Sequence, residues 1–114
     1  MTLTTFNKSF YAGEDITLPF GITNVNGAAK NINSATFRWV LYNSNTGIVV
    51  PKVSPTGFVF GDKTLGQVAV TLSSANTLNL TPDQYRHELV MTLAGKYSVE
   101  VVGELNIKKN VAVT

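Results

Sequence analysis

The sequence predicts an all-β sandwich of about seven to eight short antiparallel strands, formed by one domain that spans residues 1–114. Apolar and polar side chains alternate along most of the chain, as they do in strands that bury one face. Turn-forming residues interrupt these stretches at intervals of about 8–12 residues, a spacing typical of sandwiches and barrels. No long stretch has the period of an α-helix.

Several predicted strands have a distinctive place in the fold. Trp39 lies in the best candidate for a central strand, with its side chain in the core. Pro19 and Pro51 lack the N–H that a ladder requires, so we expect edge or bulged positions for both. Ser74 is a plausible N-cap of a single helical turn, and Gly95 marks a hairpin. The predicted strands cover about residues 5–11, 15–23, 35–42, 48–53, 57–61, 67–73, 85–93 and 97–107.

The composition argues against several classes of function. Charged residues make up 14% of the chain and the net charge is +2, with one basic pair, Lys108-Lys109. This is too little for a nucleic-acid-binding surface, so we expect no nucleic-acid partner. A surface of Thr, Ser and Asn suits a protein packed in an assembly, although strands and turns also favour these residues. With no cysteine, disulfides and thiolate chemistry are excluded.

No stretch is apolar enough to span a membrane, and the N-terminus does not resemble a signal peptide. We therefore expect no membrane partner, and synthesis in the cytoplasm.

The residues that could support catalysis have simpler explanations. His87 is the single histidine and lies within an alternating strand, which favours a structural or interface role. Glu14-Asp15, Asp62 and Asp83 occupy turns, and no calcium-binding loop is present. We therefore predict no catalytic residue, no metal site and no cofactor.

Two groups of aromatic side chains need separate interpretations. Phe37 and Trp39 share a strand face with aliphatic residues, so the core is the default for both. Phe58 and Phe60 share a face between two glycines, and they fit either the core or an exposed docking pair.

The order of turns and strands resembles a known family. The similar segments are residues 11–22, 31–39, 66–73, 81–89 and 102–107, and together they span about residues 11–108. This order resembles the immunoglobulin-like domain at the N-terminus of phage upper baseplate proteins, which also occurs in other phage tail and fibre proteins. The resemblance implies a virion attachment module with no enzymatic activity and no required cofactor.

The leading hypothesis is a structural protein of a tailed-phage virion, in the tail, baseplate, neck or fibre attachment. It would join other virion proteins through strand edges and chain ends, in several symmetric copies. Segments 1–10 and 109–114 are the expected docking arms. The candidate interface residues are Leu3, Phe6, Phe10, Phe58, Phe60, Val111 and Val113.

Three other hypotheses stay open. One is a head-decoration protein of the virion. Another is a carbohydrate- or receptor-binding module, which predicts exposed aromatic rings such as Tyr42 or Tyr85. An enzyme would require His87 to lie in a cleft with a carboxylate and a nucleophile.

Overall fold

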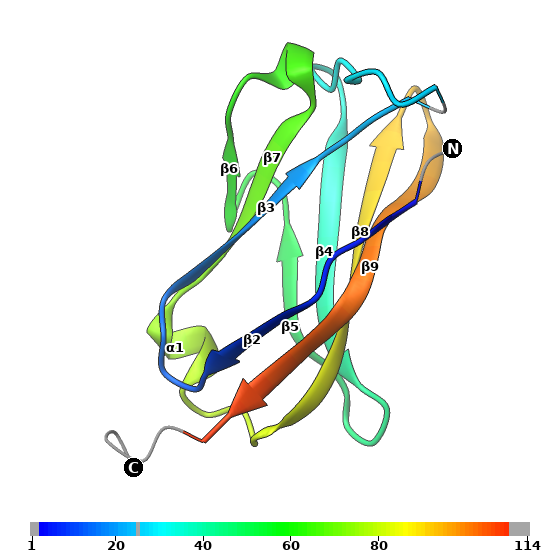
Figure 1. Cartoon of the computed structure of the whole chain (residues 1–114). Helices are drawn as coiled ribbons and strands as arrows, with labels where there is room; N and C mark the ends of the chain where they lie inside the picture. Colours follow the sequence, from blue (N-terminus) through cyan, green and yellow to red (C-terminus); the bar gives the residue numbers. More distant parts are fainter. Residues whose placement is uncertain (1–2, 25, 110–114) are drawn as a thin grey trace.

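The computed structural model describes residues 3–24 and 26–109 and forms a two-layer β-sandwich (Figure 1). The large sheet has the order β1-β9-β8-β4-β5, with β2 also paired to β9, and the small sheet has the order β3-β7-β6. The strands are β1 (Thr4–Thr5), β2 (Lys8–Tyr11), β3 (Ile16–Gly21), β4 (Thr36–Asn43), β5 (Gly47–Val53), β6 (Phe58–Phe60), β7 (Gln67–Leu72), β8 (Asp83–Leu93) and β9 (Lys96–Lys108). The predicted all-β sandwich is confirmed.

The N-terminal strands depart from the expected antiparallel arrangement. Both β1 and β2 run parallel to β9, with Thr4 opposite Val101 and Phe10 opposite Ile107. Within the two sheets, the remaining ladders are antiparallel. Alternation along a sequence gives the period of a strand but not the direction of its neighbour, so this pairing was not predictable from the pattern.

Both prolines lie where the sequence predicts them. Pro19 is in β3, an edge strand of the small sheet, and Pro51 is in β5, an edge strand of the large sheet. The β5 strand also carries a bulge, because Leu41 pairs with Val50 while the next residue of β4 pairs with Ile48. An edge position leaves the missing N–H of proline facing away from the ladder.

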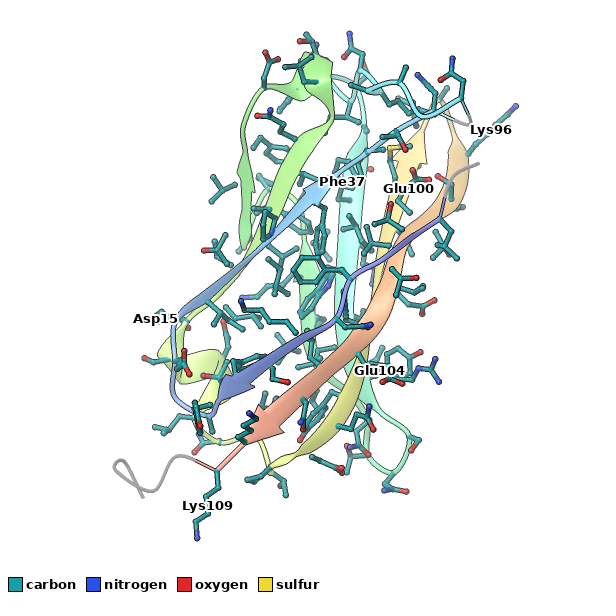
Figure 2. The ribbon with its side chains drawn as sticks, viewed as in Figure 1. Asp15, Phe37, Lys96, Glu100, Glu104 and Lys109 are labelled. Atoms are coloured by element: carbon teal, nitrogen blue, oxygen red, sulfur yellow. The ribbon has the colours of Figure 1, made fainter. Side chains whose placement is uncertain are left out.

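The core fills the space between the two sheets. Trp39 is fully buried, as predicted, together with Leu18 from the small sheet and Leu89 and Val101 from the large sheet. Figure 2 shows Phe37 lying between the sheets, where its ring contacts the rings of Phe58 and Phe60 at centroid distances of 6.3 and 6.0 Å. Phe58 is buried and Phe60 is half-buried, which favours the core among the two roles open for this pair.

The connection between β7 and β8 contains the short helix α1 (Ser74–Thr77). Its N-cap is Ser73, one residue before the predicted cap Ser74, and the Ser73 hydroxyl accepts from the N–H of Asn76. The Ser74 N–H instead donates to the Asp15 carboxylate at 2.6 Å. This contact across the chain fixes the helical turn against the loop between β2 and β3.

Removing core volume at Leu18 should destabilise the sandwich, because its side chain is fully buried. We expect Leu18→Ala to lower the free energy of unfolding by about 2–5 kcal/mol. Thr17→Ala, on the exposed face of the same strand, is the control and should change it by less than about 0.5 kcal/mol. Urea denaturation followed by Trp39 fluorescence measures both, and equal stability of the two variants would contradict this placement of the core.

Candidate interaction surfaces

The N-terminal segment is joined to β9 from Thr4 to Ala12. Between β1 and β2, the Phe6 N–H donates to the Val102 carbonyl at 2.9 Å. The side-chain oxygen of Asn7 then accepts from the Glu104 N–H at 2.9 Å, which takes the place of a backbone partner. The ladder therefore continues through the interruption between β1 and β2.

A buried imidazole links this strand to the centre of the large sheet. The indole N–H of Trp39 donates to Nδ1 of His87 at 3.1 Å, so Nδ1 carries no proton, because an indole nitrogen can only donate. The neutral ring therefore carries its proton on Nε2, which lies 2.7 Å from the Phe6 carbonyl and donates to it. His87 is 1% exposed, and both of its ring nitrogens are engaged within the domain.

Gly103 makes this contact possible. It lies opposite His87 on β9, between the imidazole and the N-terminal strand. A Cβ at this position would overlap the Phe6 carbonyl and would lie 2.9 Å from Nε2 of His87. Only a residue without a side chain leaves room for the carbonyl of one strand to reach past the next strand.

The predicted interface residues differ in how they are presented. Leu3 is 51% exposed, whereas Phe10 is 3% exposed and belongs to the core. The ring of Phe6 is half-buried, with its edge against Phe20 at a centroid distance of 5.3 Å. Phe58 and Phe60 pack inside as described above. Val111 and Val113 lie outside the described residues, as does most of segment 109–114.

Within the predicted N-terminal arm, residues 1–10, the strand β1 and most of β2 are therefore part of the domain's own sheet. The side chain of Phe10 belongs to the core and that of Phe6 packs against it, whereas Leu3, before β1, is presented to solvent. Exposed apolar side chains that the sequence analysis did not select are Tyr11, Ile48, Val53, Val59, Leu65, Leu78 and Tyr97. Strand register, which the sequence alone does not provide, was needed to find them.

The free edges of the two sheets are not equally protected. Pro19 interrupts the edge strand β3, and Pro51 together with a bulge interrupts β5. The β6 edge has neither proline nor a charged residue, and its Val59 side chain is 55% exposed. Since proteins commonly guard their edges with such devices, β6 is more open to an added strand than β3 or β5.

The hollows on the surface differ in their lining, and one of about 420 Å³ beside the β8–β9 turn is lined by Lys30, Met91, Leu93, Ala94, Lys96, Tyr97 and Ser98. A second of about 420 Å³ lies over β2, β8 and β9 and is lined by Asn7, Lys8, Ser9, Gln84, Glu104 and Asn106. Another of about 260 Å³ lies beside the turn between β4 and β5, next to Asp83.

The carboxylate of Asp83 accepts from the Gln84 N–H at 2.7 Å and from Asn43 at 3.0 Å. These two hydrogen bonds lower the pKa of Asp83, which keeps it an anion that holds the start of β8.

Tyr42 and Tyr85, the rings selected for sugar stacking, are largely enclosed, whereas Tyr97 is 81% exposed and Tyr11 is 48% exposed. Among residues 3–24 and 26–109, no group of three or more His, Asp or Glu side chains could hold a metal ion. Tyr85 is 3% exposed, so it offers no stacking surface to a sugar, and Tyr42 is half-buried. In the described part of the chain, no helix is long and apolar enough to cross a bilayer.

Comparison with known proteins finds a likeness in fold. The chain is similar to the N-terminal domain of phage TP901-1 ORF48, with a TM-score of 0.60 at 11% sequence identity. The match covers 96% of this chain and 100% of that one. No protein-family model matches the sequence, and no curated protein matches it. The class that these findings define is a two-sheet β-sandwich that is also found in a phage protein.

Gly103→Ala should loosen the N-terminal strand, because the added methyl group would push the Phe6 carbonyl away from His87. We expect a loss of about 1–3 kcal/mol in the free energy of unfolding and faster hydrogen exchange at the Phe6 N–H. Gly21→Ala is the matched control, because a Cβ there meets nothing within 4 Å. If hydrogen exchange at the Phe6 N–H is unchanged in the Gly103 variant, the space that Gly103 leaves for the Phe6 carbonyl is not needed to hold the N-terminal strand.

Acid should destabilise the fold through His87. Burial lowers the pKa of His87 below 6.5, an effect that outweighs the opposing hydrogen bond to Phe6. The unfolded chain therefore takes up the proton first, so the free energy of unfolding falls as the pH drops below about 6.5 and is flat above it. His87→Gln, which keeps an acceptor and a donor but does not titrate, should show a shallower decline between pH 7 and pH 5 in urea denaturation. An identical slope for both proteins would rule out His87 as the cause.

Proposed function

We propose that this chain is a non-enzymatic structural protein of a tailed-phage virion, in the tail, baseplate, neck or fibre attachment. The observation that carries the proposal is the likeness in fold to a phage protein domain over nearly the whole chain. Its partners are then other virion proteins, and it is present in several symmetric copies. A role without catalysis is supported by the burial of His87 and by its two hydrogen bonds.

The proposal includes an immunoglobulin-like topology for the sandwich. The order β9-β8-β4-β5 corresponds to strands G-F-C-C′ of such domains, and β3-β7-β6 corresponds to B-E-D. Trp39 occupies the buried tryptophan position of strand C. Tyr85, at the start of β8, donates its hydroxyl to the Thr81 carbonyl at 2.8 Å, as the tyrosine corner of strand F does.

The contact between the sheets supports the same topology. Many immunoglobulin domains join strands B and F by a disulfide packed against the tryptophan. Here His87 stands two residues after Tyr85, and its ring stacks on Phe20 of β3 at a centroid distance of 6.0 Å. Because the Trp39 indole also bonds to His87, an aromatic stack and a hydrogen bond occupy the place of the disulfide.

Within this proposal, docking uses strand edges and chain ends. The unguarded β6 edge offers backbone groups to an extended strand of a neighbour. The exposed Leu3 side chain marks the N-terminal contact. The C-terminal segment 109–114, with Val111 and Val113, is the second arm.

Deleting Asn110–Thr114 tests the role of the chain end. We expect the shortened protein to fold, since β9 ends at Lys108, but to be lost from purified particles by at least about tenfold. Quantitative mass spectrometry of the particles measures incorporation, with full-length protein as the reference. Normal incorporation would remove the C-terminal arm from the proposal, and absence of the full-length protein from particles would overturn the virion role itself.

The same measurement separates the tail proposal from head decoration. Head-decoration proteins cover a large shell, so a copy number in the hundreds would favour that alternative. Low multiples of three or six would support a tail, neck or baseplate position.

A further inference from the structure

The outer face of the large sheet has an unusual composition. Trp39, Leu89 and Val101 point into the core, so their neighbours along β4, β8 and β9 point outward. In antiparallel pairs, residues directly opposite each other share a face. The register therefore places Val53, Val90 and Val99 in one outward row, with Arg38 between Val53 and Val90.

The next outward row is equally apolar. Here Pro51, Val40 and Val102 lie across the strands, with Glu88 between the two valines. We call these six apolar residues the valine face: Val40, Pro51, Val53, Val90, Val99 and Val102. Val53 is 60% exposed and Pro51 is exposed, while the other four are half-buried by their neighbours in the sheet.

A solvated face of an antiparallel sheet normally carries polar side chains. The adjoining part of the same sheet follows this rule, with Arg86, Glu104, Gln84 and Asn106 on the outside. A contiguous apolar surface beside a polar one is typical of a protein contact. The valine face is thus more apolar than the solvated face of a sheet normally is.

The two charges within the valine face indicate what covers it. Arg38 lies opposite Val90, and Glu88 lies opposite Val40, so the two charged residues are diagonal neighbours of opposite sign. Within the described residues, neither side chain makes a hydrogen bond or an ion pair. The charges of Arg38 and Glu88 therefore cancel within the square that these two residues form with Val40 and Val90, and each offers an ionic group that has no partner among the described residues. Glu100, which the bulge in β9 leaves without an opposite residue beside Val99, is 4% exposed.

Arg38, Val40, Glu88 and Val90 form the corners of a self-complementary square on the surface of the sheet. Consider a two-fold axis that lies in the contact plane along the diagonal from Val40 to Val90. Rotation about this axis brings Val40 and Val90, which lie on the axis, each against its own equivalent in the second copy. The same rotation exchanges the positions of Arg38 and Glu88. Arg38 of each copy then faces Glu88 of the other, which gives two ion pairs around an apolar centre.

We propose that a second copy of this chain packs face to face on the valine face, with Arg38 and Glu88 forming reciprocal ion pairs. This contact differs from the edges and chain ends of the proposed function and requires no other virion protein. Its test therefore uses the purified full-length chain, whereas the virion role is tested in particles.

Sedimentation velocity over a concentration series measures the association. We expect a concentration-dependent dimer, and Val90→Glu should abolish it because a carboxylate would be buried against its equivalent. Arg38→Glu should weaken dimerisation by about tenfold or more, since both ion pairs become repulsive. The double variant R38E/E88R should restore it, because reversing both charges restores both pairs.

Lys8→Glu is the matched control, since it makes the same charge change at an exposed position of β2, beyond β9 and away from the valine face, and should leave the dimer intact. Circular dichroism of each variant checks that the fold is kept, and the double variant keeps the test decisive if one single variant unfolds. A chain that stays monomeric at all concentrations would overturn the proposal. So would a dimer that Val90→Glu leaves intact, or one that the double charge reversal fails to restore.

Discussion

One chain of hydrogen bonds determines how the edge of the large sheet is built. It runs from the indole N–H of Trp39 through the imidazole of His87 to the carbonyl of Phe6. The chain requires a neutral imidazole, a glycine at position 103 and a strand that approaches β9 from the side opposite β8. The same imidazole stacks on Phe20 of the small sheet, so one side chain connects both layers and the N-terminal strand.

The surfaces of the sandwich differ in the kind of neighbour they suit. Edges offer backbone groups, and the β6 edge lacks the proline that interrupts β3 and β5. The outer face of the large sheet instead offers side chains, apolar over the valine face and polar beside it. An assembly could thus use its faces for copies of the same chain and its edges for other proteins.

Much of the fold was predictable from the sequence, because a buried face leaves an alternating pattern. The strands, the edge positions of Pro19 and Pro51, and the burial of Trp39 follow from that pattern. The same pattern did not show that Phe10 is buried and Phe6 half-buried, since alternation indicates that one side of a strand is apolar without showing what that side faces. The valine face was invisible for a related reason, because Val40 and Val90 add apolar residues to the polar side and are brought together only by register.

The parallel pairing of the N-terminal strand has a mechanical consequence. Thr4 pairs near the middle of β9 and Tyr11 pairs with Lys108 at its end, while Lys96 and Lys109 mark opposite ends of the molecule (Figure 2). A pull applied between Thr4 and Lys108 would therefore slide the two strands past each other instead of peeling them apart. In that shear geometry the hydrogen bonds of both segments, and the Phe6 carbonyl lodged over Gly103, share the load at the same moment. The sandwich is thus arranged to resist tension along its own long axis.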